Sequence, residues 1–388
     1  MNFARHFDGP EGQEDMPYLL TPGPLTTSRT VKLALLADWG SRDVEFRQLV
    51  KDIRQDLLRI AGCDDSYACV IMQGSGTFAI EAALGALTPQ KGSRKKSLVV
   101  ANGAYGERAA QILDRIGRPY ERISKTDTTQ VVPEHFVHLL DDDKAISHVW
   151  FIHCETTSGI VNPLAELAAA VKLRGRISMV DAMSSFGALE INMTRDAIDV
   201  LVSSSNKCIE GIPGFSYVLV KRHLLEASAG QSHSVVLDLF DQWKGLEATG
   251  QFRFTPPTHA LVAFAQALRE LEDEGGVATR LKRYRRNAEV LLQGMAEIGI
   301  RPLLSGNEAG PIIQTFLTPR DSNFKFEIFY EKLRARGFAI YPGKLTQRDS
   351  FRIGTIGRLD ERVMVRAVEA IKAVLADMNV KDMMPRDL

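Results

Sequence analysis

The chain has 388 residues, and its 48 lysines and arginines balance 48 aspartates and glutamates. Hydrophobic residues at 45% and charged residues at 25% are typical of a globular protein and exclude a disordered or fibrous chain. A neutral chain without a basic block is not expected to bind nucleic acid, and its apolar runs are too short to span a membrane. The length fits two domains or one large α/β unit.

The first sixteen residues are polar and glycine-rich, and we expect them to form a loose N-terminal extension. They lack the apolar segment of a secretory signal. Two prolines then exclude a helix from residues 18–26 and favour an extended entry into the fold. Apolar residues at helical spacing follow, first over residues 28–37 and then over residues 46–60.

From residue 68 to residue 220, short apolar runs alternate with longer amphipathic stretches. The stretches over 78–87, 107–116 and 163–173 have the period of helices. The short runs lack polar alternation, which is typical of strands buried on both faces of a mostly parallel sheet. These runs occupy residues 69–72, 97–101, 148–152, 177–180, 200–202 and 217–220. We therefore expect an α/β domain with helices covering its sheet.

Beyond residue 222, two long helical patterns precede a shorter segment of mixed α+β character. The helical patterns cover 259–273 and 279–298, and the mixed segment contains elements over 312–317, 324–336, 338–341, 351–353 and 362–378. Gly275 and Gly276 offer a hinge between the two parts. We therefore predict an extension over 1–16, a large domain over 17–274 and a small C-terminal domain over 275–388.

The four cysteines are too few and too scattered for a disulfide framework, and none of them forms a C-x-x-C pair. His153 and Cys154 are the only close pair of metal-ligand types. Adjacent residues on a strand point to opposite faces, so we expect no metal site there. These observations favour a cytoplasmic protein with reduced thiols.

Residues 73–79, Gln-Gly-Ser-Gly-Thr-Phe-Ala, follow one expected strand and open a helix. Backbone N–H groups at a helix start, with glycines that permit close approach, make a site for an anion such as phosphate. The same residues satisfy the G-x-G-x-x-A pattern of dinucleotide enzymes, which also requires an acidic residue at the end of the next strand. That strand ends at residues 101–103, Ala-Asn-Gly, without a carboxylate. A tight turn that only needs glycine is the alternative.

Two further polar residues follow apolar strands. Asp181 comes directly after the run over 177–180, and Lys207 follows the run over 200–202. The carboxyl ends of strands in an open α/β sheet meet at one edge, where ligands bind. A solvated aspartate and a surface lysine are each ordinary when taken alone. Together with the glycine turn, they form the set that pyridoxal phosphate needs, which is a lysine for a Schiff base, a carboxylate for the ring nitrogen and a phosphate cup.

With these motifs in place, the chain resembles the class V branch of the fold-type-I pyridoxal-phosphate aminotransferases, from Leu20 to Gly354. The matching stretches are 20–29, 73–77, 102–106, 155–159, 180–187, 206–208, 252–255, 263–267, 341–344 and 351–354. The resemblance implies a mostly parallel seven-stranded sheet covered by helices, plus a smaller C-terminal α+β domain. It also implies a homodimer whose active sites are shared between the subunits.

The resemblance implies a role for each matching residue. Lys207 would form the Schiff base with pyridoxal 5′-phosphate, and Asp181 would keep the ring nitrogen of the cofactor protonated. Arg352 would bind the carboxylate of the substrate. The other cofactor contacts would be ring stacking by Tyr105, a hydroxyl contact from Thr156, a phosphate cup made by Ser75, Gly76, Thr77 and Asn206, and Thr255 from the neighbouring subunit.

Several activities stay open at this point. The stretches 180–187 and 206–208 resemble the aminoethylphosphonate branch of the family, with pyruvate as acceptor, but alanine–glyoxylate and serine–pyruvate transaminases are alternatives. A cysteine desulfurase needs a cysteine well after the lysine, and no cysteine follows Cys208. A dinucleotide-dependent oxidoreductase lacks its acidic residue. A non-catalytic scaffold leaves Asp181, Lys207 and the glycine turn without an explanation.

Overall fold

The computed structural model describes residues 16–306, 308–343 and 348–386, so the expected extension lies outside the described residues except for Met16. Its centre is a seven-stranded sheet in the order β2-β10-β9-β8-β5-β3-β4. Only β10 runs antiparallel to its neighbours within this sheet, which confirms the expected α/β fold. The strands are β2 (Tyr67–Gln73), β3 (Lys96–Ala101), β4 (Tyr120–Ser124), β5 (Ile146–Ile152), β8 (Ile177–Asp181), β9 (Val200–Ser204) and β10 (Phe215–Lys221).

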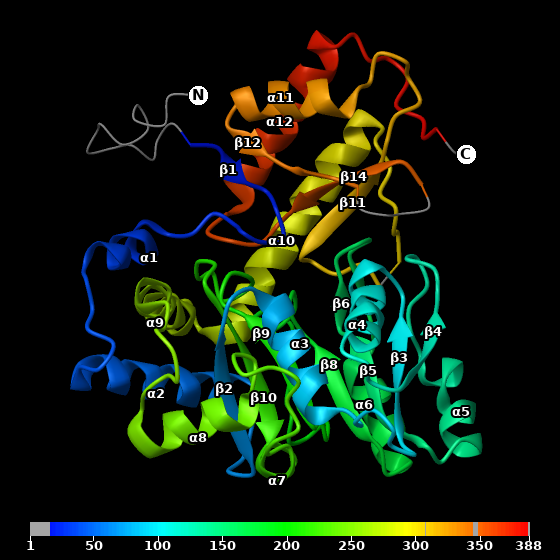
Figure 1. Ribbon diagram of the computed structural model, residues 1–388. Helices are drawn as coiled ribbons and strands as arrows, with labels where there is room; N and C mark the ends of the chain where they lie inside the picture. Colours follow the sequence, from blue (N-terminus) through cyan, green and yellow to red (C-terminus); the bar gives the residue numbers. More distant parts are fainter. Residues whose placement is uncertain (1–15, 307, 344–347, 387–388) are drawn as a thin grey trace.

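Helices cover both faces of this sheet (Figure 1). One face packs against α2 (Val44–Ile60), α5 (Val137–Asp142), α6 (Leu164–Leu173) and α9 (Thr258–Asp273). The other face packs against α3 (Gly76–Leu87), α4 (Ala104–Arg115) and α7 (Arg222–Ala227). Helix α8 (Leu239–Thr249) lies beside β2 and contributes to both apolar layers.

The strand β2 illustrates why the strands read as continuous apolar runs. Val70 and Met72 pack in one apolar layer, whereas Cys69 and Ile71 pack in the other. Successive side chains of a strand point to opposite faces, so burial of both faces leaves no position for a polar residue. All four side chains are nearly inaccessible to solvent. The core is therefore two apolar layers separated by the sheet.

The C-terminal part of the chain has its own apolar core, assembled around α10 (Gly276–Ile298) and α12 (Glu361–Asp377). Figure 1 shows α10 running from the region of α9 into this part of the molecule. The C-terminal part also contains the sheet β11-β14-β13, made of β11 (Ile313–Leu317), β14 (Ser350–Gly354) and β13 (Tyr341–Pro342). It further contains α11 (Phe326–Ala335) and β12 (Phe338–Ala339). The predicted domain boundary at residues 274 and 275 stays a prediction.

The N-terminal segment packs on this C-terminal part, because β1 (Tyr18–Leu19) pairs in parallel with β12. Leu20 belongs to the same apolar core. The chain then passes the end of β14, where the N–H of Gly354 donates to the carbonyl of Leu20 at 2.8 Å. The remaining short elements are α1 (Arg29–Leu33), the 3₁₀ turns η2 (Ala34–Leu36) and η3 (Pro133–His135), and the hairpin of β6 (Cys154–Glu155) and β7 (Ile160–Val161).

Candidate active site

The polar groups predicted from the sequence follow three strands of the central sheet at the same edge. The β2–α3 turn, Asp181 at the end of β8 and the loop after β9 all lie there. β10 starts at this edge and joins two of the three, because it lies between β2 and β9. Its Ser216 is opposite Ser204 and donates its hydroxyl to the carbonyl of Ser75 at 3.1 Å. The sheet therefore brings the three groups together as expected.

The turn between β2 and α3 is built for close approach. Gly74 has φ of +99°, in the left-handed region that favours glycine. Ser75 is the N-cap residue of α3, but its side chain makes no capping bond to the helix. Any side chain at residue 76 would collide with the thioether of Met183. The helix start therefore presents backbone donors that the N-cap side chain does not use, which suits a bound phosphate.

Asp181 is a buried carboxylate with 2% of its surface exposed. Its Oδ1 accepts a hydrogen bond from the N–H of Met183 at 2.9 Å. Burial raises the pKa of Asp181 to about 7, and the charges of Lys207 and Arg108 oppose this rise only in part. A further cation placed beside this carboxylate would favour its ionised form.

Lys207 lies in the loop after β9 and is half-buried. Its Nζ donates to the carbonyl of Gly23 at 3.3 Å, so the N-terminal segment passes directly beside the amine. The neighbouring Asn206 accepts a hydrogen bond from the Ser204 hydroxyl at 3.1 Å. This arrangement places an amine and an amide side chain at the sheet edge that also carries Asp181.

Glu155 organises the part of the site that comes from α4. It is completely buried, and its carboxylate accepts hydrogen bonds from the N–H groups of Tyr105 at 3.1 Å and Thr157 at 3.0 Å. Burial raises the pKa of Glu155, although these hydrogen bonds oppose the shift. The guanidinium carbon of Arg108 lies 5.1 Å from the ring centre of Tyr105. The Glu155 carboxylate therefore fixes the backbone of Tyr105 at the start of α4.

Arg352 reaches the site from β14. It is 4% exposed, and burial lowers the pKa of its guanidinium. Its Nη1 donates to the carbonyl of Thr156 at 2.8 Å, and its Nε donates to the carbonyl of Pro342 at 3.0 Å. Tyr341 lies with its ring centre 5.8 Å from the guanidinium carbon. The two carbonyls hold the plane of the guanidinium, so this arginine is a preorganised cation and not a solvated one.

Thr255, like Ser75, is exposed on this chain. Its carbonyl accepts a hydrogen bond from the Gln73 side chain at 2.5 Å. The segment before α9 therefore lies beside the β2–α3 turn. Its predicted role in a neighbouring subunit stays a prediction.

Comparison with known proteins identifies the family. The model of the family "aminotransferase class-V" matches residues 38–329. A 2-aminoethylphosphonate–pyruvate transaminase of Rhizobium meliloti is 50% identical over 95% of this chain and 96% of its own length. Another, of Paraburkholderia xenovorans, is 49% identical over 94% of this chain and 93% of its own. The chain belongs to the class V aminotransferase family.

A solved structure supports the same fold for this aminotransferase. The pyridoxamine–pyruvate aminotransferase of Mesorhizobium loti matches with a TM-score of 0.86 over 95% of both chains. At 22% sequence identity this likeness concerns the fold alone. This family membership excludes two interpretations that the sequence left open, a dinucleotide-dependent oxidoreductase and a non-catalytic scaffold.

Class V aminotransferases work with pyridoxal 5′-phosphate, and the edge of the sheet fits this cofactor. The start of α3 fits the phosphate, because the side chain of its N-cap residue Ser75 makes no capping bond to the helix. Asp181 is a buried carboxylate whose ionised form needs a cation, which the protonated ring nitrogen would supply. Lys207 offers the amine, and α3 offers the helix start for the phosphate.

Sequence reasoning assigned no role to Glu155 or Met183, although both lie in matching stretches. Glu155 follows a buried strand directly, and this position is a signal that could have singled it out. Met183 packs over Gly76 through tertiary contact, and no pattern in the sequence predicts that contact.

Within the described residues, no helix has the length and apolar character needed to cross a membrane, and no group of three acidic, histidine or cysteine side chains could hold a metal ion.

Proposed function

We propose that this aminotransferase moves the amino group of 2-aminoethylphosphonate to pyruvate, which yields phosphonoacetaldehyde and L-alanine. The observation that carries the choice of donor is the set of relatives with this name, which are 46–50% identical over 94–95% of the chain. The buried Arg352 supports it, because both the phosphonate of the donor and the carboxylate of the acceptor need a cation.

When bound, pyridoxal 5′-phosphate supplies a carbonyl carbon that captures amines and a ring that accepts an electron pair. Lys207 Nζ would hold the cofactor, and its free amine would move the proton at the donor carbon. Asp181 holds the proton on the ring nitrogen, because its burial makes an adjacent cation favourable. These two roles divide the proton chemistry between the ends of β8 and β9.

The other predicted residues bind and orient the cofactor in this proposal. Tyr105 would cover one face of the ring, and its backbone is fixed by Glu155. The Thr156 hydroxyl would contact the ring oxygen, while its carbonyl aligns Arg352. Ser75, Gly76, Thr77 and Asn206 would hold the phosphate at the start of α3.

The donor is tested by offering purified enzyme 2-aminoethylphosphonate, alanine, serine and taurine in turn, with pyruvate or glyoxylate as acceptor. We expect 2-aminoethylphosphonate with pyruvate to have the highest kcat/KM. A higher kcat/KM for alanine with glyoxylate, or for serine with pyruvate, would assign one of the other class V activities instead.

In the same assay, we expect Arg352→Ala to raise KM for donor and acceptor alike, by about 100-fold for a lost charge-assisted pair. An unchanged donor half-reaction would show that the phosphonate binds elsewhere.

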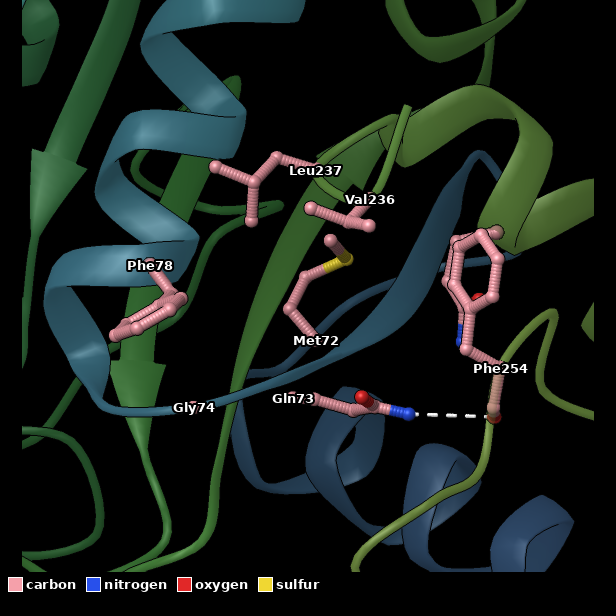
Figure 2. Close-up of a pocket in the computed structure, with 8 residues that line it drawn as sticks. Met72, Gln73, Gly74, Phe78, Val236, Leu237 and Phe254 are labelled. Carbon is pink, nitrogen blue, oxygen red and sulfur yellow. Dashed lines mark hydrogen bonds between the residues drawn. The ribbon is translucent and has the colours of Figure 1, made fainter. Parts of the chain in front are cut away.

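We further propose that the working enzyme is a homodimer. Beside the β2–α3 turn there is a cavity of about 310 Å³ lined mainly by apolar side chains. Figure 2 shows Phe78, Val236 and Phe254 around it. These side chains are 50%, 62% and 44% exposed, and such a cluster on a single chain is typical of an interface. The occupant we propose is a second copy of the chain, because Thr255 adjoins the same surface.

Shared active sites predict complementation between inactive variants. In a mixed dimer of Lys207→Ala and Thr255→Ala chains, one site receives both intact residues and the other receives both substitutions. We expect a refolded mixture to regain activity at limiting cofactor, whereas each variant alone stays impaired. Absence of recovery in dimers shown to be mixed would contradict a shared site.

The cavity beside the β2–α3 turn supplies the control for this experiment. We expect Val236→Asp to yield monomers in analytical ultracentrifugation and to abolish the complementation. Leu173→Asp, at an 84% exposed position on α6, should leave both unchanged.

For the location of the enzyme we propose the cytoplasm, since all four cysteines are free thiols.

A further inference from the structure

The loop that carries Lys207 contains a backbone conformation that is rare for its residue type. Glu210 has φ of +66°, and it is 2% exposed. A residue with a side chain is strained in this left-handed region unless its surroundings hold it there. The N–H of Glu210 donates to the carbonyl of Lys207 at 2.8 Å, and the N–H of Gly211 donates to the carbonyl of Ser205 at 3.0 Å. Glu210 therefore closes the turn in which Lys207 lies.

The carboxylate of Glu210 is held by helix α10. Its Oε1 accepts hydrogen bonds from the hydroxyl of Tyr284 at 2.5 Å and from Nη2 of Arg283 at 2.7 Å. Arg280, which is completely buried, donates through Nη1 to the carbonyl of Cys208 at 3.0 Å. The same helix thus binds the lysine loop through a side chain and through the main chain.

The opposite side of Arg283 binds the segment that follows β14. Its Nη1 donates to the carbonyls of Gly357 at 2.6 Å and Leu359 at 2.9 Å. On the next turn of α10, Asn287 donates to the carbonyl of Thr355 at 3.0 Å. Because β14 carries Arg352, one guanidinium contacts both the turn of the catalytic lysine and the continuation of the strand that carries the substrate arginine.

We propose that Glu210 and Arg283 are positioning residues, which set Lys207 relative to Arg352 through one ion pair whose carboxylate is buried. This inference rests on the proposed roles of Lys207 and Arg352 and goes beyond them. The strain at Glu210 has a physical reason in this arrangement. A glycine would adopt the same φ freely, but it would leave Arg283 and Tyr284 without their shared acceptor.

The chain contains a matched control for this pair. Glu274 accepts hydrogen bonds from Arg280 at 2.9 Å and from Arg283 at 2.7 Å. It therefore neutralises the same two arginines as Glu210, but its own hydrogen bonds go to these arginines and not to the Lys207 loop. Glu274→Gln and Glu210→Gln each remove one negative charge from the same buried cluster. Only the second removes the hold on the lysine turn.

The experiment follows the visible absorbance that develops when pyridoxal 5′-phosphate is added to the apoenzyme, which reports bond formation at Lys207 without any substrate. We expect Glu210→Gln to slow this step by about tenfold to 100-fold, the cost of misplacing a reacting group by about 1 Å. Glu274→Gln is expected to stay within a factor of about two, because its loss does not reach the reacting geometry. Thermal unfolding of both variants is measured in parallel to compare their stability.

Arg283→Met tests the second half of the inference, because it releases both the lysine turn and the segment after β14. We expect it to slow the bond formation at Lys207 and also to raise KM for pyruvate, whereas Glu210→Gln leaves KM for pyruvate close to that of the wild type. If Glu210→Gln fails to fold, Glu210→Gly removes the same carboxylate and relieves the backbone strain.

Equal slowing by Glu210→Gln and Glu274→Gln, or no slowing by either, would overturn the inference and leave a cluster that only stabilises the fold. Failure of the proposed donor would look different, since the absorbance step needs no donor. A wild-type apoenzyme that forms no bond with the cofactor would instead contradict the proposed role of Lys207.

Discussion

Replacing Lys207 by alanine is expected to lower amino transfer by about 10⁴-fold, the upper end of what a positioned proton-transfer group contributes. The amine has two functions in the proposed chemistry, since it holds the cofactor and moves the proton. Single-turnover mixing of the loaded enzyme with 2-aminoethylphosphonate measures the loss without interference from product release.

Lys172→Ala is the matched control for this variant, because Lys172 is exposed on α6. We expect it to retain wild-type rates. A small primary amine added to the Lys207→Ala enzyme should recover part of the activity, because it can carry the proton at the vacated position. A Lys207→Ala enzyme with a rate near that of the wild type would show that another group moves the proton.

Replacing Asp181 by asparagine is expected to lower activity and to raise stability in the absence of cofactor. The carboxylate has a pKa of about 7 in the folded chain, against 3.8 as the ordinary value. Between these two pH values the folded state binds the proton more tightly than the unfolded state, so the free energy of unfolding falls as pH rises. A difference of about three pKa units corresponds to about 4 kcal/mol at pH 8.

Urea unfolding of the two cofactor-free proteins checks this sign. We expect Asp181→Asn to be more stable than the wild type at pH 8 by a few kcal/mol, and the difference to shrink toward zero as pH falls to about 4. Activity of the loaded variant should fall by about 100-fold or more, because the ring nitrogen loses its ionic partner. A variant that is less stable than the wild type at pH 8 would contradict the burial penalty at Asp181.

Much of the fold could be predicted because buried strands have a simple signature. The apolar runs at β2, β3, β5, β8, β9 and β10 were expected where the structure has them. The edge strand β4 was not expected, since Tyr120–Ser124 is polar and only half-buried. The pairing of β1 with β12 joins residues more than 300 positions apart, and neither two-residue strand carries a pattern of its own.

The candidate site was predictable to the extent that strand order determines it. Asp181, Lys207 and the Gly74 turn follow strands of one sheet, so elementary topology places them at one edge. Arg352 comes from a different sheet, and only the family resemblance pointed to it. The hydrogen bonds of Glu155 and Glu210 depend on side chains brought from far along the chain. A role for Thr255 requires a second chain, which the sequence of one cannot describe.

The lysine that carries the cofactor can be identified chemically. Borohydride reduces the bond between pyridoxal 5′-phosphate and its lysine to a stable amine, and peptide mapping by mass spectrometry then locates the added mass. We predict that the added mass lies on Lys207 alone, and that addition of 2-aminoethylphosphonate before the borohydride prevents the labelling. Labelling of another lysine, or labelling that the amino donor leaves unchanged, would contradict the proposed active site.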